Sequence, residues 1–131
     1  MKAKTDNKDL IGIAEKARQN AVADFSGFRV GAAILADDGR VFTGCNVENP
    51  SLMLTICAER VAILKALSEG ARSFKKIAVF AARNPCFPCG SCRQMLFEFA
   101  QGLEVITVDS TGRIKCVRID KLLPKAFKYK K

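Results

Sequence analysis

Two short cysteine motifs constrain this chain more than any other feature of its sequence. The first is Cys57-Ala58-Glu59, and the second, further along the chain, is Pro88-Cys89-Gly90-Ser91-Cys92. The sequence contains no histidine, so a soft metal ion would have to be held by thiolates without an imidazole ligand. Three thiolates and one open position are a recognised arrangement for zinc. The motifs therefore predict a site for one zinc ion per chain, formed by Cys57, Cys89 and Cys92.

Both motifs open an apolar, helix-like run. We expect one helix over residues 55–69, with Val61, Leu64 and Leu67 on its buried face, and another over residues 89–101. The N-terminus of a helix presents free N–H groups and a partial positive charge, which favour the thiolate over the thiol. Two such helix starts that converge on one metal would stabilise all three cysteine ligands.

The other periodic segments predict the rest of the fold. A helix is expected first, because Leu10 and Ala14 begin an apolar face of helical spacing, and the turn at Asp38-Gly39 is a hairpin signal. The expected elements are a helix over residues 6–23, strands over 28–35, 40–45, 76–82, 104–108 and 114–119, and the two helices above. This order predicts an α/β protein, a three-layer α/β/α sandwich around a mixed five-stranded sheet.

Length and composition indicate one globular domain. The 131 residues are expected to form a single domain, with flexible ends at residues 1–6 and 128–131. No apolar run approaches the roughly 18 to 20 residues that span a bilayer, and the polar N-terminus does not have the pattern of a signal peptide. We therefore expect a cytoplasmic protein with no membrane partner, in which cysteines are more often free or metal-bound than disulfide-bonded.

The net charge of +9 raises the question of a nucleic-acid partner. The basic residues are scattered, apart from a cluster in the tail made by Lys125, Lys128, Lys130 and Lys131, and one Tyr with no Trp is a thin supply for base stacking. We expect no nucleic-acid partner. A basic nucleic-acid-binding or editing module stays open as an alternative of another class.

Three interpretations of the cysteine motifs are open. In a catalytic site, zinc lowers the pKa of a bound water from about 16 to about 7, and Glu59, two residues beyond a ligand, takes up and delivers protons. In a structural site, Cys86 supplies a fourth thiolate, although it precedes Pro88 and lies outside the predicted helix. An iron–sulfur cluster usually needs a further Cys-Pro pair, which does not follow Cys92.

Two other groups of residues are open to a plain and a functional interpretation. Cys45 and Cys116 lie in strand-like runs, where they are most simply buried small apolar residues. The polar run Asn46-Val47-Glu48-Asn49-Pro50 follows a predicted strand. It fits ordinary turn chemistry, and it also fits hydrogen-bonding groups at the mouth of a site.

The chain resembles the small, homotetrameric zinc-dependent cytidine deaminases over about residues 10–127. The resemblance rests on separated motifs: Phe28-Arg29-Val30-Gly31-Ala32-Ala33, Gly44-Cys45-Asn46-Val47-Glu48-Asn49, Cys57-Ala58-Glu59-Arg60, Pro88-Cys89-Gly90-Ser91-Cys92-Arg93-Gln94 and Leu122-Leu123-Pro124-Lys125-Ala126-Phe127. It implies hydrolysis of cytidine and deoxycytidine to the uridines with release of ammonia, in pyrimidine salvage, by a homotetramer whose active sites are shared between subunits.

The resemblance also implies roles for single residues. Those matched are the zinc ligands Cys57, Cys89 and Cys92; the proton shuttle Glu59; the ribose-binding Asn46 and Glu48; Phe28, which packs against the pyrimidine; Ala58, whose backbone hydrogen-bonds to the base; Arg60, a cation that tempers the thiolate charge; and Phe127, which enters a neighbouring subunit's pocket.

Several positions depart from the family pattern. Pro50, Ser51 and Leu52, followed by Met53, stand where the family usually has Ala, a small residue and Tyr. Phe87, preceded by Cys86, stands where a small residue usually precedes the Pro-Cys pair. These changes predict intact chemistry with an altered substrate preference. The alternative substrates are another aminopyrimidine nucleoside or a cytosine-containing antibiotic; Asn46 and Glu48 favour a ribose over the antibiotic.

Overall fold

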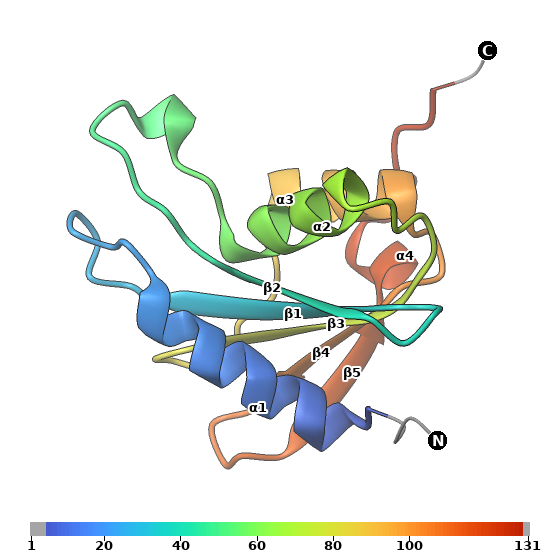
Figure 1. The fold of residues 1–131 in the computed structure, drawn as a ribbon, viewed down its shortest axis with the longest axis horizontal. Coiled ribbons are helices and arrows are strands. Elements are labelled where there is room, and N and C mark those ends of the chain that lie inside the picture. Colours follow the sequence, from blue (N-terminus) through green and yellow to red (C-terminus); the bar gives the residue numbers. More distant parts are fainter. Residues whose placement is uncertain (1–4, 130–131) are drawn as a thin grey trace.

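The computed structural model describes residues 5–129 as a five-stranded mixed sheet with helices on both faces (Figure 1). The strands lie in the order β2-β1-β3-β4-β5, and the β3–β4 pair is parallel whereas the other pairs are antiparallel. The elements are α1 (Asn7–Ala17), a 3₁₀ turn η1 (Arg18–Asn20), β1 (Val30–Ala36), β2 (Val41–Cys45), a 3₁₀ turn η2 (Leu52–Leu54), α2 (Ala58–Ser68), β3 (Phe74–Ala81), α3 (Gly90–Phe99), β4 (Glu104–Val108), β5 (Ile114–Arg118) and α4 (Ile119–Leu122).

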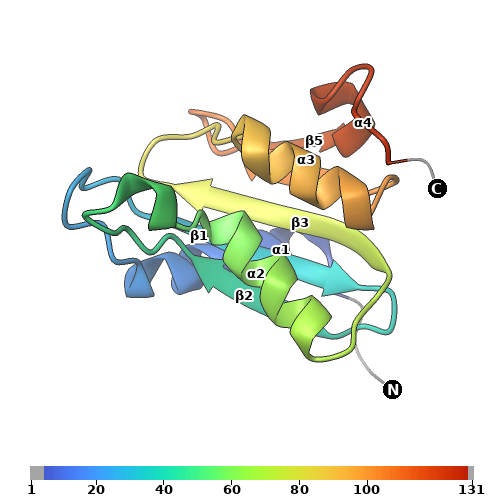
Figure 2. The ribbon, with the colours of Figure 1, turned by 90° about the horizontal axis from the view of Figure 1, so that it is seen from above.

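The sheet separates two apolar layers, as a three-layer sandwich requires. On one face, Leu10, Ile11 and Ala14 of α1 pack against the residues of β1, β3 and β4 whose side chains point to that face of the sheet. On the other face α2 and α3 lie side by side over the sheet (Figure 2) and close the larger part of the core. The predicted α/β/α sandwich with a mixed five-stranded sheet is confirmed.

Two glycines bring a helix close to each face of the sheet. A Cβ at Gly31 in β1 would lie 1.9 Å from the Ala14 carbonyl oxygen of α1. A Cβ at Gly44 in β2 would lie 2.3 Å from the Ala58 carbonyl oxygen of α2. Backbone therefore rests directly on backbone at both places, and Gly44 sets the distance between the sheet and the first turn of α2.

This close contact explains why the predicted buried face of α2 is wrong. Small residues face the sheet, namely Ala58, Ala62 and Ala66, together with Ile63. Val61 and Leu67 are half-buried, and Leu64 is 43% exposed. A larger side chain would hold the helix further from Gly44 than the backbone contact allows.

The first helix is shorter than predicted because the residues that follow η1 are extended and pair with another segment of the chain. α1 ends at Ala17 and continues only as η1. Val22 then forms an isolated bridge with Val47: its N–H donates to the Asn46 carbonyl (2.9 Å) and its carbonyl accepts from the Glu48 N–H (2.8 Å). These bonds fix the segment after α1 beside the segment after β2.

Smaller differences concern the chain ends and the edge strand. Neither η2 nor the four-residue α4 was expected from the sequence. Cys116 is exposed, because β5 is an edge strand whose residues are mostly uncovered, and Cys45 is only half-buried, so neither is the buried residue predicted. Of the predicted flexible ends, residues 1–4 and 130–131 lie outside the described residues; Asp6 caps α1 through a capping box.

Candidate metal centre and active site

Three thiols meet where α2 and α3 begin. Cys57 is the N-cap residue of α2, Cys89 is the N-cap residue of α3, and Cys92 lies in the first turn of α3. Cys57 Sγ lies 3.8 Å from Cys89 Sγ, which lies 3.4 Å from Cys92 Sγ, and all three sulfurs lie within 4.8 Å of one another. Tetrahedral zinc with Zn–S bonds of about 2.3 Å requires sulfurs about 3.8 Å apart. The cluster therefore fits one zinc ion.

The surroundings of Cys57 favour its thiolate form. The hydrogen bond from Cys92, followed by contacts with Arg60 and Cys89, lowers the pKa of Cys57 to about 5 despite partial burial. The same bond to Cys57, followed by burial, raises the pKa of Cys92. Binding of a metal ion by thiolates would release the thiol protons.

Arg60 lies beside this charge. Its Nη2 donates to the Thr55 carbonyl oxygen (3.2 Å) and lies 3.7 Å from Cys57 Sγ. Its Nε is buried and has no hydrogen-bond partner among residues 5–129. A cation held in this position compensates negative charge on the thiolates.

Glu59 is the buried carboxyl group next to the cluster. It lies in the first turn of α2 and is 4% exposed. Burial, with a further contribution from the charge of Cys57, raises the pKa of Glu59 to about 7. A carboxyl group with this pKa can both accept and release a proton near neutral pH.

Cys86 does not complete a four-thiol cluster. Among residues 5–129 the group of potential ligands that lie together consists of Cys57, Cys89 and Cys92. Burial, then the charges of Glu59 and Cys57, raise the pKa of Cys86 to about 11, so its side chain stays a neutral thiol. A zinc ion held by the three cysteines would keep an open position, as catalytic zinc sites do.

A cavity of about 290 Å³ opens onto the cluster. Cys57, Cys89 and Glu59 line it, and aromatic side chains from two loops, Phe28 and Phe87, form part of its walls. Its other lining residues are Ser26, Val30, Asn46, Glu48, Thr55, Ala58 and Cys86. The volume lies near the lower limit of the roughly 300 to 1,000 Å³ typical of small-molecule pockets.

Asn46 holds the loop that carries Phe28. Its Oδ1 accepts the Val30 N–H (2.8 Å) and its Nδ2 donates to the Phe28 carbonyl oxygen (2.8 Å). The side chain is buried and lines the cavity. A primary amide has two N–H donors and two acceptor lone pairs, so one of each is left for a ligand.

Glu48 is anchored at the cavity mouth by the 25–26 loop. Its carboxylate accepts the backbone N–H groups of Phe25 and Ser26 (both 3.0 Å) and the Ser26 hydroxyl. The Ser26 side chain is the main cause that lowers the pKa of Glu48. Glu48 therefore stays ionised near neutral pH and lines the cavity.

Two predicted residues lie away from this cavity. Leu52 is 80% exposed and lines a second hollow of about 220 Å³ that shares Ser26, Glu48 and Thr55 with the first. It lies on the segment that reaches away from the sheet in Figure 1. Phe127 is 69% exposed, and its carbonyl accepts from Gln94 Nε2 (3.1 Å); it does not line the cavity of its own chain.

The structure also shows positioning residues that sequence reasoning did not find. Thr55 Oγ1 accepts the Asn49 N–H (3.0 Å), and buried Thr107 Oγ1 accepts the Cys86 N–H (3.3 Å). Arg93 donates to the carbonyls of Pro88 (2.6 Å) and Leu122 (2.9 Å). Arg93 follows Cys92 and Thr55 lies two residues before Cys57, so their closeness in sequence to the cysteine motifs could have indicated that they lie near the site. No sequence feature around Thr107 indicates its role.

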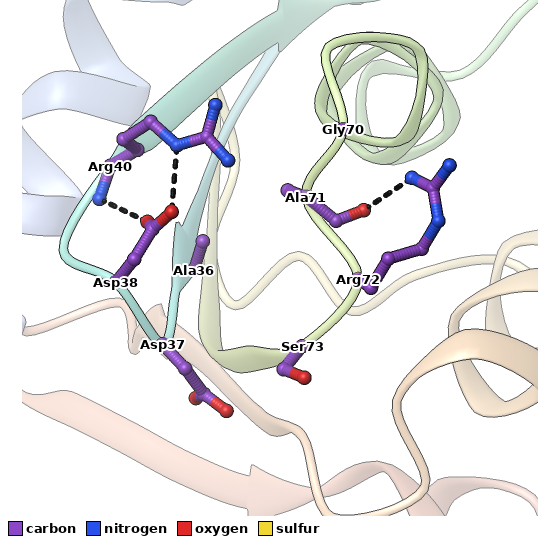
Figure 3. A pocket seen from close by; sticks show the side chains of 8 residues that line it. All are labelled: Ala36, Asp37, Asp38, Arg40, Gly70, Ala71, Arg72 and Ser73. Carbon is purple, nitrogen blue, oxygen red and sulfur yellow. Dashed lines mark hydrogen bonds and ion pairs between the residues drawn. The ribbon is translucent and has the colours of Figure 1, made fainter.

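A further cavity of about 210 Å³ lies at the other end of α2 (Figure 3). Its arginines are engaged: Arg40 pairs with Asp38 (2.8 Å), and Arg72 donates to the carbonyls of Ala71 and Leu67 (both 2.8 Å). The bond to Leu67 satisfies a carbonyl group in the last turn of α2. None of the three clustered cysteines lines this cavity.

Across residues 5–129 no helix combines the length and the apolar character needed to cross a membrane.

The fold and this centre, three thiols around one open position beside a buried carboxyl group, define a zinc-dependent hydrolase of the nucleobase deaminase type. Residues 4–108 match the family described as the cytidine and deoxycytidylate deaminase zinc-binding region, and the chain belongs to that family.

Named relatives agree with this assignment. The chain is 47% identical over 124 residues to a cytidine deaminase of Sporosarcina psychrophila, a match that covers 93% of this chain and 91% of the relative. It is 44% identical to the cytidine deaminase of Halalkalibacterium halodurans, covering 93% and 94%. The crystal structure of cytidine deaminase from Burkholderia pseudomallei superimposes with a TM-score of 0.88 at 44% identity and covers 93% of this chain and 99% of that one.

Proposed function

We propose that this protein is a zinc-dependent hydrolase that converts cytidine and deoxycytidine to uridine and deoxyuridine with release of ammonia. The observation that carries this proposal is the three-thiol cluster next to buried Glu59, with Cys57, Cys89 and Glu59 lining a small cavity. The identity to named cytidine deaminases over nine tenths of the chain supports the choice of substrate.

Cys57, Cys89 and Cys92 would hold the zinc ion, which when bound supplies Lewis-acid activation of a water molecule. Glu59 would accept the two protons of the water one after the other and deliver one to ring nitrogen 3 and one to the amino group. The water oxygen would replace the amino group on carbon 4, and ammonia would leave. A pKa of about 7 suits Glu59 for both directions of transfer.

Other cavity residues would orient the nucleoside. The base packs against Phe28 and hydrogen-bonds to the backbone of Ala58, whose N–H is in the first turn of α2, where helical N–H groups have no partner within the helix. The ribose hydroxyls bond to the remaining donor and acceptor of Asn46 and to Glu48. Arg60 compensates the charge of the thiolates.

The proposal extends to the assembly and its setting. We place the enzyme in pyrimidine salvage in the cytoplasm, as a homotetramer with shared active sites. The exposure of Phe127 and of the apolar residues Leu52 and Met53, 80% and 95% exposed, supports an additional protein surface over these positions. Phe127 would then enter the cavity of a neighbouring subunit.

The test of the mechanism is Glu59→Gln, which keeps the size of the side chain and removes its proton transfer. We expect about one zinc ion per chain, as in the wild type, with kcat for cytidine lower by about 10² to 10⁴. Zinc content by atomic absorption and ammonia release are measured on the same sample. Wild-type turnover in the variant would show that Glu59 is not the proton shuttle.

A further inference from the structure

Phe87 forms a second aromatic wall of the cavity, in addition to Phe28. Both side chains are half-buried, both line the cavity, and both pack against the main core. They come from different parts of the chain: Phe28 precedes β1, and Phe87 lies between β3 and α3. In a cavity of about 290 Å³, a phenyl ring on the wall removes space that a small side chain would leave free.

The loop that carries Phe87 is held from three sides. Asn84 exchanges two hydrogen bonds with the Ala81 backbone, through Oδ1 (3.1 Å) and Nδ2 (2.9 Å). The Cys86 N–H donates to fully buried Thr107, and Arg93 Nε donates to the Pro88 carbonyl. Each bond joins the residues beside Phe87 to β3, β4 or α3. The backbone on both sides of Phe87 is thus tied to the sheet and to α3.

Phe87 also lines the same cavity as Cys57, Cys89 and Glu59, and it is close to the thiol cluster in the chain. It is two residues before Cys89, a member of the thiol cluster, and follows Cys86, whose thiol lies close enough to Glu59 and Cys57 for their charges to act on it. In a deaminase of this kind the atom that reacts is carbon 4 of the pyrimidine. The exocyclic amino group and carbon 5 are both bonded to carbon 4, and both can carry a methyl group. A bulky side chain in the cavity wall beside carbon 4 would therefore meet substituents on one of these two atoms.

We propose that Phe87 is a specificity-determining residue that limits the base to cytosine without a methyl group on carbon 5 or on the amino nitrogen. This inference rests on the proposed deaminase function and deepens it. A cavity that must reject one methyl group by shape alone discriminates by about 10- to 200-fold. We therefore expect the wild type to prefer cytidine over 5-methylcytidine, N4-methylcytidine or both by at least about tenfold.

The experiment measures kcat/KM for cytidine, 5-methylcytidine and N4-methylcytidine with the wild type and Phe87→Ala. The readout is the ratio of each methylated substrate to cytidine on one sample, because this ratio does not change with the fraction of folded or zinc-loaded enzyme. Phe99→Ala is the matched control: it removes a phenyl ring from α3 at a position that is half-exposed and outside the cavity. Phe87→Leu removes the phenyl ring but keeps an apolar side chain that fills part of its volume. Comparison with Phe87→Ala therefore separates the effect of the ring's size from the effect of lost packing.

We expect Phe87→Ala to raise at least one of the two ratios by fivefold or more, Phe87→Leu to raise the same ratio less, and Phe99→Ala to leave both unchanged. A change below fivefold in both ratios would overturn the inference while leaving the deaminase function intact. If the wild type does not act on cytidine, the proposed function fails instead. Calorimetric binding of uridine and 5-methyluridine to the zinc-loaded proteins then tests the wall, and an unchanged affinity ratio in Phe87→Ala would overturn it.

Discussion

The contact between β2 and α2 at Gly44 gives a quantitative test of how the fold positions the site. In Gly44→Ala the new Cβ would lie 2.3 Å from the Ala58 carbonyl oxygen and 2.6 Å from the Ala62 nitrogen. Ordinary van der Waals contact begins at 3.4 Å, so the first distance is about 1 Å too short. Both obstructing atoms belong to the backbone, where no side chain can rotate away. The first turn of α2 must therefore move from the sheet.

This displacement acts on the site because α2 begins at the cluster. Cys57 is its N-cap residue, and Glu59 lies in its first turn. Overpacking of this kind costs about 1 to 3 kcal/mol of folding free energy, which for a chain of this size lowers Tm by about 4 to 12 °C. A misplacement of about 1 Å in catalytic groups reduces the rate by about 100-fold. We expect both effects in Gly44→Ala, with weaker zinc binding.

Gly31→Ala is the matched control on the opposite face. Its Cβ would lie 1.9 Å from the Ala14 carbonyl oxygen, so it displaces α1, which carries no residue of the site. Thermal unfolding, zinc titration and kcat/KM for cytidine are measured for both variants at a temperature where both are folded. We expect Gly31→Ala to lose at least as much Tm, with kcat/KM within about twofold of the wild type. Equal losses of activity in both variants would show that the contact at Gly44 does not position the site.

Three further predictions follow from the site and the fold. Cys89→Ser should reduce zinc to well below one ion per chain after dialysis, whereas Cys86→Ser should keep one, because Cys86 lies outside the thiol cluster; equal zinc contents would contradict the ligand set. Gly12→Ala should raise the free energy of unfolding by about 0.5 to 1 kcal/mol in urea titrations, because Gly12 lies within α1 and a Cβ there meets no atom within 4 Å. The Ser26 and Phe25 contacts lower the pKa of Glu48 below 4.5, so this group stabilises the fold above that pH and loses the contribution as the pH falls through the native pKa. The Tm advantage of the wild type over Glu48→Gln should therefore shrink below pH 4.5, and a constant difference down to pH 3 would contradict it.

The sequence contained enough information for the sheet and the metal cluster. Apolar periodicity and the Asp38-Gly39 turn predicted all five strands within a few residues, because these signals are local. The two cysteine motifs predicted that helix starts bring the thiols together, since Cys57 and Cys89 directly precede helices. Spacing alone left the fourth coordination position open to Cys86, and the three-dimensional arrangement was needed to place Cys86 outside the cluster.

The remaining differences depend on contacts between distant parts of the chain. Leu64 is exposed, although it follows helical apolar spacing, because Gly44 in another element requires small residues at the contact with α2. α1 ends early because Val22 pairs with Val47. The amide of Asn46 holds the Phe28 loop, a role that the turn-like run around it does not reveal. No local pattern in the sequence encodes these pairings.

Deamination is tested most directly by following the ultraviolet absorbance of cytidine against time with the wild-type protein, together with zinc per chain on the same sample. We expect about one zinc ion per chain, loss of the cytosine absorption band and release of one ammonia for each uridine formed. A protein that binds zinc at Cys57, Cys89 and Cys92 but leaves cytidine unchanged would contradict the proposed substrate. A fully folded protein that binds no zinc would contradict the catalytic site itself.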